Sequence, residues 1–395
     1  MFQFEEIKKD KKTNARAGLI KTEYGHFPTP LYVFAGTDAE VRTLNKTQLQ
    51  TVRALIANTY HLGVRTSKVN KIKQAGGLHK FMGFKGLTLT DSGGFQVFSY
   101  GFARQHGIGK IGFFPEKNKP IKADKNLVKI TDQGAFFTDE QEKERFLGPK
   151  ESIRIQEKIG ADIIIAFDEC TSPFHSHTYT KQSLKRTHAW AQQCLNLKKS
   201  HQAIYGVIQG GEFKDLRQQS ADFVSALPFN GLAIGGPLGK SKSDMKKILG
   251  WLVPSFKKHP NKPRHLLGIA KPEDLFMGIE KGIDTFDCVI PTREARHGSV
   301  YTSKGRVDLN KGIRRGDNQP IEKGCSCQAC LSKTKQELKA MLKSNSPTQK
   351  TKAVQLLTLH NIIWFQSLMD KIRQSIIKGR FSQFKQSFLK KYQNK

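Results

Sequence analysis

Hydrophobic residues are concentrated in eight short segments along the first three quarters of the chain, and most of these segments end in polar residues or glycine. Several are almost continuously apolar, as at residues 163–167, which is typical of parallel strands buried on both faces. The predicted strands are residues 30–34, 54–59, 87–90, 161–167, 203–208, 231–234, 264–269 and 286–290.

Segments with the periodicity of amphipathic helices lie between many of these strands, at residues 150–159, 180–196, 216–226, 243–252 and 272–281. Eight strands that alternate with helices predict an α/β protein with a closed (β/α)8 barrel, also called a TIM barrel. Catalytic residues of such barrels lie at the carboxyl ends of the strands, so candidate residues are sought there.

Two regions interrupt this alternation. Residues 101–149 are too long for a simple crossover, carry several lysines and contain a turn at Asp132-Gln133-Gly134, so we expect an inserted hairpin region over the catalytic face. The alternation ends after Arg306, where a cysteine-rich segment begins. We predict a catalytic barrel over residues 1–306 with the insertion at about 101–149, a metal-binding subdomain over 307–370 and a basic C-terminal helix or tail over 371–395.

The composition is that of an ordinary globular protein. The chain of 395 residues is 37% hydrophobic and 25% charged, and its mean hydropathy is -0.50. No stretch approaches the ~20 consecutive apolar residues of a membrane-spanning helix, which excludes a membrane-embedded protein. The N-terminal residues lack the apolar segment and cleavage site of a secretory signal, so we expect a cytoplasmic protein.

Positive charge is in large excess. Sixty-six Lys and Arg against 34 Asp and Glu give a formal net charge of +32, which attracts polyanions. Nucleic acid is the first partner to consider, although a lysine-rich genome raises the charge of every protein. The segment from Lys371 onward is basic without any acid, and its apolar residues are expected to pack on the domain beneath a basic outer face. These apolar residues are Ile372, Ile376, Phe381, Phe384 and Phe388.

Three of the six cysteines, Cys325, Cys327 and Cys330, lie within six residues of each other. This clustering argues against a disulfide framework in a chain of this size and favours a metal site. His360, 30 residues after Cys330 on a predicted helix at 354–369, either completes a tetrahedral Cys3His site or is an ordinary buried histidine. Four protein ligands leave no open position, so a zinc ion bound there would be structural.

Three aspartates, Asp91, Asp168 and Asp287, stand at or near the ends of three predicted strands. The strand ends of a closed barrel face one pocket, so we expect these carboxyl groups to converge. Carboxylates that share a pocket repel each other and their pKa values separate, so that one is an ionised nucleophile while another carries a proton. Each aspartate alone would instead be a helix cap or a hydrogen-bond acceptor.

Paired glycines follow three of the predicted strands, at positions 93–94, 210–211 and 235–236. Glycines at strand ends let the backbone approach a flat ligand and expose its N–H and C=O groups. A phosphate-binding loop is the alternative, but none of the three pairs has the spacing Gly-x-x-x-x-Gly-Lys. We therefore favour a planar heterocycle, with Asp168 and Gln209 reading its edge and Phe95 stacking on its face.

Taken together, these motifs resemble those of the bacterial-type tRNA-guanine transglycosylases, or queuine tRNA-ribosyltransferases, from about residue 30 to about residue 376. The matching segments, in family order, are DSGGFQ at 91–96, FDECT at 167–171, QG at 209–210, FDCVIPTR at 286–293, and the three clustered cysteines with His360. The resemblance implies a (β/α)8 barrel with an attached zinc subdomain. It also implies exchange of the wobble guanine in the anticodons of tRNAs for Asp, Asn, His and Tyr for a 7-deazaguanine base.

By position in these motifs, the resemblance implies that Asp287 attacks the anomeric carbon of ribose and that Asp91 is the general acid and base for the two bases. Breaking an N-glycosidic bond builds oxocarbenium character, which a carboxylate on the opposite face captures as an ester, as in retaining glycosidases. Because the ester stores the bond energy, the exchange needs no nucleotide cofactor, and we expect ping-pong kinetics.

The resemblance also implies the binding residues. The base-binding positions are Ser92, Phe95, Asp168, Cys170, Gln209, Gly235, Gly236, Leu267 and Gly268, with Phe95 and Leu267 on either side of the ring. Lys271, Arg293 and Arg296 match basic positions that hold the UGU-containing anticodon loop of tRNA. Cys325, Cys327, Cys330 and His360 match the ligands of one structural Zn²⁺ ion. The family further implies a homodimer and no membrane partner.

The chain departs from the bacterial pattern near the base-binding residues. In bacterial enzymes a glutamate closely follows the Gly-Gly pair and helps orient a carbonyl toward the aminomethyl cation of the queuine precursor, whereas here no acid lies between Gly236 and Asp244. Phe95 replaces the usual bacterial tyrosine and matches eukaryotic queuine-inserting enzymes, while Cys170 keeps the bacterial residue. We hypothesise that the chain prefers queuine or exchanges bases with relaxed specificity.

Two alternatives stay open from the sequence. One is a non-catalytic tRNA-binding subunit of the same fold, which the presence of both Asp91 and Asp287 disfavours. The other is a zinc-containing barrel hydrolase of small glycosides, which the positive charge and the pair Arg293 and Arg296 disfavour. Loss of guanine exchange in Asp287→Ala separates the first from a catalytic enzyme, and a denaturation-resistant adduct with tRNA separates the second.

Overall fold

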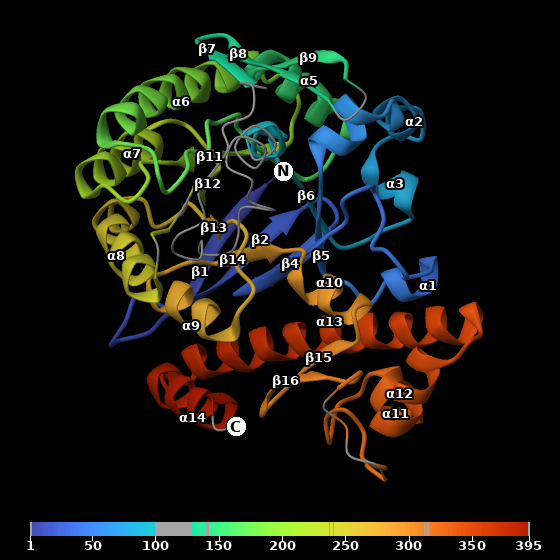
Figure 1. Ribbon diagram of the computed structural model, residues 1–395. Helices are drawn as coiled ribbons and strands as arrows, with labels where there is room; N and C mark the ends of the chain where they lie inside the picture. Colours follow the sequence, from blue (N-terminus) through green and yellow to red (C-terminus); the bar gives the residue numbers. More distant parts are fainter. Residues whose placement is uncertain are drawn as a thin grey trace.

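The computed structural model describes residues 2–98, 128–139, 142–236, 238–239, 241–311, 313 and 316–393. Its centre is a closed barrel of eight parallel strands (Figure 1), in which Ile163 pairs with Leu89 to complete the ring. In spatial order the strands are β4 (Leu31–Ala35), β5 (Ala54–Ala57), β6 (Leu87–Thr90), β10 (Ile163–Ile165), β11 (Ala203–Ile208), β12 (Gly231–Ile234), β13 (Arg264–Leu266) and β14 (Thr285–Cys288). Each overlaps a strand predicted from the sequence, so the predicted barrel is confirmed.

Helices follow one another around the outside of the barrel (Figure 1). The five predicted helices correspond to α5 (Pro149–Ile159), α6 (His177–Leu197), α7 (Lys214–Ala226), α8 (Lys242–Lys258) and α9 (Pro272–Glu280). α6 and α8 begin at Ser176 and Ser241, whose side chains each accept a hydrogen bond from a backbone N–H of the first turn. Shorter helical segments are α1 (Lys46–Leu49), the π-helix η1 (Tyr60–Arg65), α2 (Lys68–Gln74), α3 (Leu78–Met82) and α10 (Ile290–Arg296).

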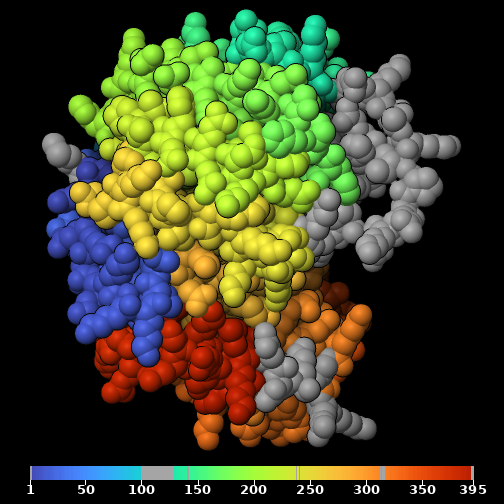
Figure 2. Space-filling view, turned by 90° about the vertical axis from the view of Figure 1, so that its left-hand side faces the viewer, coloured from blue at the N-terminus to red at the C-terminus, as the bar shows by residue number. Residues whose placement is uncertain are grey.

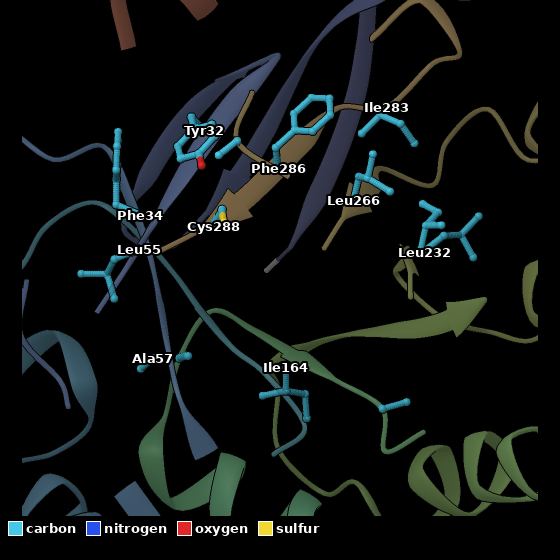
Figure 3. Packing of buried hydrophobic residues seen from close by; sticks show 14 of the residues in the cluster. Tyr32, Phe34, Leu55, Ala57, Ile164, Leu232, Leu266, Ile283, Phe286 and Cys288 are labelled. Carbon is cyan, nitrogen blue, oxygen red and sulfur yellow. The ribbon is translucent and has the colours of Figure 1, made fainter. Parts of the chain in front are cut away.

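Side chains of the barrel strands alternate between two hydrophobic clusters. Inward-facing residues such as Val33 fill the barrel interior, whereas their neighbours, such as Phe34, pack outward in the larger cluster beneath the helices. Figure 3 shows outward-facing residues from several strands, among them Leu55, Ile164 and Phe286. The period of two therefore tells which residues at the strand ends face the barrel axis.

An antiparallel sheet that the hydrophobic pattern did not indicate lies at the amino-terminal end of the barrel. Its strands are β1 (Gln3–Lys9), β2 (Arg16–Thr22) and β3 (Gly25–Thr29). Phe4, Ile20 and Phe27 of this sheet belong to the same cluster as the barrel interior. Arg16 donates to both carboxylate oxygens of the buried Asp284, at 2.8 and 2.6 Å, and so ties the sheet to the start of β14.

A second antiparallel sheet lies within the predicted insertion. It comprises β7 (Val128–Thr131), β8 (Gly134–Thr138) and β9 (Glu144–Leu147). Thr131 pairs with Gly134 across the turn at 132–133, so the predicted hairpin is confirmed in this part. The remainder of the predicted insertion, at 101–127 and 140–141, lies outside the described residues.

The C-terminal part adds a hairpin and four helices. They are β15 (Ser299–Thr302), β16 (Gly305–Asp308), α11 (Gln328–Ser332), α12 (Lys335–Lys343), α13 (Pro347–Ile377) and α14 (Phe381–Gln393). In Figure 2 the C-terminal segment, coloured red, lies beside the N-terminal segment, coloured blue; Arg373 of α13 donates to the carbonyl oxygens of Gly18 and Thr29, at 2.5 and 2.6 Å. Ile372, Ile376 and Phe381 are fully buried, and Phe384 and Phe388 pack beside them, as predicted.

α13 runs without interruption across residue 370. The division of the chain into a barrel, an insertion, a metal-binding subdomain and a basic tail stays a prediction. Among the described helices, none combines the length and the apolar character that crossing a membrane requires.

Candidate active site and metal centre

The alternation of the barrel strands turns Asp91 and Asp287 toward the barrel axis. Leu87 and Leu89 of β6 face the interior, and Asp91 follows in the same parity. Asp287 lies in β14 between Phe286 and Cys288, which both pack outward. The two aspartates, predicted from the sequence to share one site, therefore both face inward near the carboxyl ends of their strands.

Asp91 is held by donors from the end of β5 and from its own loop. The backbone N–H groups of Thr59 and Gly93 donate to Oδ1 at 2.9 and 3.1 Å, and Asn58 Nδ2 donates to Oδ2 at 2.5 Å. Gly93 has a φ of +78°, which glycine adopts without the strain that a side chain would cause. The carboxyl group is thus fixed by three hydrogen bonds.

Burial raises the pKa of Asp91 to about 7, although the N–H groups of Thr59 and Gly93 act in the opposite direction. The charge of Asp287 also contributes to raising the pKa of Asp91, because the two carboxyl groups interact across the same end of the barrel. A carboxyl group that titrates near neutral pH can both give and take a proton there.

Asp287 is held through its Oδ1 atom. The imidazole Nε2 of His265 lies 3.1 Å from Asp287 Oδ1, and the N–H of Gly268 donates to the same oxygen at 3.2 Å. The Asp287 side chain is 17% exposed, so it is reachable from solvent while its neighbour His265 is fully buried. A partly exposed carboxylate fixed through one oxygen is suited to act as a nucleophile.

Asp168, Gln209 and Ser92 form a buried polar group beside these residues. Gln209 Nε2 donates to Asp168 Oδ2 at 2.6 Å, and Ser92 Oγ donates to Oδ1 at 3.4 Å. Burial raises the pKa of Asp168 to about 6, against the opposite effect of these two donors. Gln209 Oε1 is buried and has no hydrogen-bond partner within the described residues, so it is available to accept from a ligand.

Gly235 and Gly236 leave room for Gln209 that no side chain would allow. A Cβ atom on Gly236, whose φ is +75°, would stand 2.3 Å from Gln209 Oε1, and one on Gly235 would stand 2.6 Å from Gln209 Nε2. The buried Arg217 of α7 donates to the carbonyl oxygen of Gly235 at 2.9 Å and to that of Gly211 at 2.7 Å. Two of the three loops that carry paired glycines are therefore held by one guanidinium group.

The remaining predicted base-binding residues differ in how far they are exposed to solvent. Burial raises the pKa of the Cys170 thiol to about 12, so it is neutral at physiological pH. Phe95 is 42% exposed, which leaves its ring available for stacking. Leu267 is half-buried against the interior cluster, and Gly268 is exposed. Ser92 also caps the helical residues that follow, since Gly94 N–H donates to its hydroxyl at 3.3 Å.

The three predicted tRNA-binding residues lie on two elements that follow neighbouring strands. Lys271 is exposed and directly precedes α9, whereas Arg293 and Arg296 lie on α10, after β14. Burial lowers the pKa of Arg296, and the charges of Arg42 and Arg293 act in the same direction. Three arginines therefore lie close together beside the strand that carries Asp287, which makes an anion-attracting region.

The metal-ligating atoms of Cys325, Cys327, Cys330 and His360 all lie within 4.8 Å of one another. His360 Nδ1 faces the three sulfur atoms, at 3.9, 3.3 and 3.4 Å in chain order. Its Nε2 lies 2.8 Å from the carbonyl oxygen of Tyr301, which fixes the ring so that Nδ1 is free to bind a metal. Three thiolates and one imidazole match the donor set of a tetrahedral zinc site.

The helix that carries His360 also contacts the element that carries the arginines. Asn361 Nδ2 donates to the carbonyl oxygens of Pro291 and Ser299 at 2.8 and 3.1 Å, and Tyr301 N–H donates to Asn361 Oδ1 at 3.1 Å. α13, α10 and β15 are thereby joined next to the metal centre. The position of Arg293 and Arg296 thus depends on the same helix as the metal ligands.

Sequence reasoning missed the residues that hold the two aspartates. Asn58 lies inside the predicted strand at 54–59 and directly after β5 of the structure, and a polar residue near the end of that apolar run was a usable signal. His265 lies inside a predicted strand, two positions before Leu267, so the period of two would have turned it inward. The residues gathered at this end of the barrel thus include both the predicted aspartates and unpredicted partners for them.

Comparison with known proteins relates the whole chain to one family. Residues 10–394 match the family model described as queuine tRNA-ribosyltransferase. A protein from Archaeoglobus fulgidus is 43% identical over 394 residues, which cover 95% of this chain and 96% of that protein. Proteins named queuine tRNA-ribosyltransferase from Halothermothrix orenii and Bacillus subtilis are 38% and 36% identical; each alignment covers 99% of this chain and 98% and 96%, respectively, of those proteins.

Proposed function

Because the chain belongs to the queuine tRNA-ribosyltransferase family and is thus a tRNA-guanine transglycosylase, we propose that it replaces the wobble guanine in the anticodons of tRNAs for Asp, Asn, His and Tyr with a 7-deazaguanine base. The observation that carries this proposal is the pair of inward-facing carboxyl groups, in which the charge of Asp287 helps raise the pKa of Asp91. One group is suited to bond with ribose and the other to transfer a proton.

In the first half of the proposed exchange, a carboxylate oxygen of Asp287 bonds to C1′ of the ribose while the bond from C1′ to N9 of guanine breaks. The electron pair of that bond leaves with guanine, which takes a proton from Asp91, whose pKa of about 7 suits this transfer. In the second half, Asp91 takes a proton from the incoming base, whose N9 then displaces Asp287 from C1′. The tRNA chain stays covalently held between the two halves.

The buried polar group supplies the proposed binding site for both bases. Asp168 and the free Oε1 of Gln209 are suited to read the amino and ring N–H groups of a guanine-like edge. The Gly235-Gly236 backbone can approach that edge closely because neither residue carries a side chain. Phe95 and Leu267 are proposed to sandwich the ring, and Ser92, Cys170 and Gly268 to line the same site.

The basic residues at this end of the barrel are proposed to hold the anticodon loop around its UGU sequence. Lys271, Arg293 and Arg296 would contact phosphates that flank the target nucleotide, which must leave its stack to reach Asp287. We further propose a homodimer and a cytoplasmic location, where the tRNA substrate is found.

We propose that one Zn²⁺ ion binds Cys325, Cys327, Cys330 and His360. The donor set fits the ion: three soft thiolates face one imidazole nitrogen, and the other imidazole nitrogen is fixed by the carbonyl oxygen of Tyr301. With four protein ligands the ion would hold α11 to α13 and would take no part in the base exchange.

The choice of incoming base is the finest part of the proposal. Asp244, the first acid after Gly236, lies in the first turn of α8, where its N–H donates to Ser241 Oγ at 3.1 Å and its Oδ2 accepts the Ser241 hydroxyl at 2.8 Å. In bacterial enzymes the glutamate closely follows the Gly-Gly pair. Asp244 does not stand at that position in the sequence, and its carboxylate takes part in the helix cap. We therefore propose a preference for queuine, or relaxed specificity, over strict use of the cationic aminomethyl precursor.

The test is to incubate unmodified tRNA-Tyr with the protein and guanine, queuine or the aminomethyl precursor, and to analyse the nucleosides by mass. We expect incorporation at the wobble position and, during turnover, a protein–tRNA adduct that survives denaturation. Clear preference for the aminomethyl precursor would reject the base preference, and no exchange at all would reject the function.

Asp287→Ala and Asp91→Asn serve as the matched variants of this test. Asp287→Ala should form no adduct, whereas Asp91→Asn should retain tRNA binding and lose about 10²-fold or more in exchange rate, as expected for loss of a general acid. Adduct formation by Asp287→Ala would assign the nucleophile to another residue.

A further inference from the structure

His265 is a fully buried histidine at the catalytic end of the barrel to which the exchange described above gives no role. It lies on β13, and its neighbour Leu266 packs outward, so the imidazole faces the barrel axis. Nε2 lies 3.1 Å from Asp287 Oδ1, and Nδ1 lies 2.9 Å from Thr285 Oγ1. The ring therefore bridges two side chains of the adjacent strand β14.

The two oxygens of the Asp287 carboxylate have different surroundings. Oδ1 is contacted by His265 Nε2 and accepts the N–H of Gly268 at 3.2 Å. For Oδ2, the part of the chain that the structure describes offers no donor within hydrogen-bonding distance. Oδ1 is thus the anchored oxygen, and Oδ2 is the one with its lone pairs available to react.

The contacts of the imidazole also determine its tautomer. A carboxylate oxygen accepts hydrogen bonds, so Nε2 must carry a hydrogen to bond with Asp287 Oδ1. With the ring hydrogen on Nε2, Nδ1 accepts the hydroxyl hydrogen of Thr285, which is 2% exposed. Thr285 thereby favours the tautomer that donates to Asp287.

We propose that His265 is a positioning residue that orients the Asp287 carboxylate so that Oδ2 forms the bond to the ribose. The proposal rests on the proposed function, because it assumes that Asp287 is the nucleophile. When the bond from Oδ2 to C1′ forms and the bond from C1′ to N9 breaks, the electron pair leaves with guanine, which is protonated by Asp91. His265 keeps its hydrogen throughout, and Oδ1 becomes the carbonyl oxygen of the ester, which still accepts the same two hydrogen bonds.

The hydrogen bond from His265 restricts rotation of the Asp287 carboxylate about its terminal side-chain torsion. The terminal torsion of an aspartate side chain is broad, so without an anchor the two oxygens sample many orientations. Two donors to one oxygen limit that rotation and hold the other oxygen toward the sugar. A nucleophile displaced by about 1 Å can lose roughly 10²-fold in rate, which sets the scale of the expected effect.

The test compares His265→Leu, which removes the donor, with His265→Gln, whose side-chain amide keeps an N–H. For each variant, kcat and KM are measured for exchange of labelled guanine into unmodified tRNA, together with adduct formation and thermal unfolding. We expect His265→Leu to lower kcat about 10- to 100-fold with KM for guanine changed less than about 3-fold. His265→Gln should recover most of the lost rate.

His259→Gln is the matched control, since it alters a half-buried histidine at the C-terminal end of α8, toward the amino-terminal end of the barrel. It should exchange guanine at the wild-type rate. Wild-type kcat in both His265 variants would overturn the proposal, and so would an equal loss of kcat in two folded variants, because the hydrogen bond would then not be the cause. No exchange at all by the wild-type protein would instead reject the proposed function, and adduct formation by Asp287→Ala would assign the nucleophile to another residue, whatever the His265 variants do.

Discussion

Asp91 is the residue whose protonation should control the rate. Its carboxyl pKa is raised to about 7, chiefly by burial, so the fraction that carries a proton falls as the pH rises through 7. We predict that the single-turnover release of guanine from tRNA declines above about pH 7, approaching tenfold per pH unit where Asp91 is largely ionised. Rapid-quench measurements between pH 5.5 and about 9 check this, with Asp91→Asn as the control. A wild-type rate that rises steadily across this range would contradict the assigned role.

The same raised pKa makes a prediction for stability. In the unfolded chain Asp91 has the ordinary aspartate pKa of about 3.8, and in the folded protein its pKa is about 7, so between these values the folded state binds more protons. The contribution of Asp91 to stability is therefore fully present below about pH 4 and is lost as the pH rises toward 7. Relative to wild type, Asp91→Asn should gain roughly 1 to 4 kcal/mol in free energy of unfolding between pH 4 and 7. Urea unfolding of both proteins at several pH values measures this difference, and a constant difference would oppose it.

A substitution at Gly236 tests whether this residue borders the proposed base-binding site. A second glycine variant separates that effect from backbone strain. Gly236→Ala introduces a Cβ 2.3 Å from Gln209 Oε1 at a φ of +75°, so Gln209 must move away from the base site. We expect KM for guanine to rise about tenfold or more. Gly83→Ala has a similar φ of +62° but meets no atom within 4 Å, so it should lose about 1 kcal/mol in stability without changing KM. Equal KM values in the two variants would show that Gly236 does not border the base.

At the scale of elements, the barrel could be predicted and its N-terminal sheet could not. The barrel strands are buried on both faces, so β10 and β11 appear in the sequence as continuous apolar runs. In β1, by contrast, Phe4 is buried and the other residues, Ile7 among them, are exposed, which leaves no alternating pattern to detect. The sheet exists because tertiary contacts override a weak local signal.

The candidate site, like the fold, could be predicted from the sequence only in part. Asp91 and Asp287 could be found because they stand at the ends of strands and within recognisable motifs. Asn58 and His265 stand in predicted strands, but their hydrogen bonds to the two aspartates could not be predicted, because a hydrogen bond between neighbouring strands depends on barrel closure and register. Likewise, the sequence does not show that Gln209 Oε1 and Asp287 Oδ2 lack a donor among the described residues, because this depends on where the surrounding donors lie in the fold.

Loss of the metal is predicted to affect both α13, which supplies a metal ligand, and α10, which α13 contacts. α13 supplies His360 and, through Asn361, contacts Pro291 of α10, so loss of the metal should loosen the helix that carries Arg293 and Arg296. We expect chelation to release one zinc per chain, to lower the unfolding temperature by about 5 °C or more and to weaken tRNA binding. Metal analysis, calorimetry and tRNA binding measure these effects.

Asn361→Ala provides the comparison for chelation, because it removes the contact with α10 while leaving all four metal ligands. It should keep its zinc and still bind tRNA more weakly. Wild-type tRNA affinity in both the zinc-free protein and Asn361→Ala would show that the metal region does not support α10.

At the scale of the whole molecule, one buried ion pair joins the N-terminal sheet to the barrel. Arg16 and Asp284 are 1% and 0% exposed, and Asp284 also accepts the backbone N–H of Arg264 at 2.8 Å. We predict that Arg16→Met destabilises the protein by about 3 to 5 kcal/mol, because Asp284 then remains buried without the guanidinium group that donates to both of its oxygens. The double variant Arg16→Met with Asp284→Leu should recover part of this loss. Chemical denaturation measures both, and additive losses would show that the pair is not coupled.

The net charge of +32 acts on tRNA as a whole and should make binding depend steeply on salt. Each phosphate neutralised by a basic side chain releases counterions, so the logarithm of affinity falls linearly with the logarithm of salt concentration. We predict that Arg293→Ala and Arg296→Ala each reduce that slope by about 1, while KM for free guanine, a neutral base, is unchanged. Lys257→Ala is the control, since Lys257 lies in the last turn of α8, toward the amino-terminal end of the barrel. If Lys257→Ala changed the slope as much as the two arginine variants, the overall charge alone would attract tRNA. Arg293 and Arg296 of α10 would then not contact the tRNA phosphates specifically.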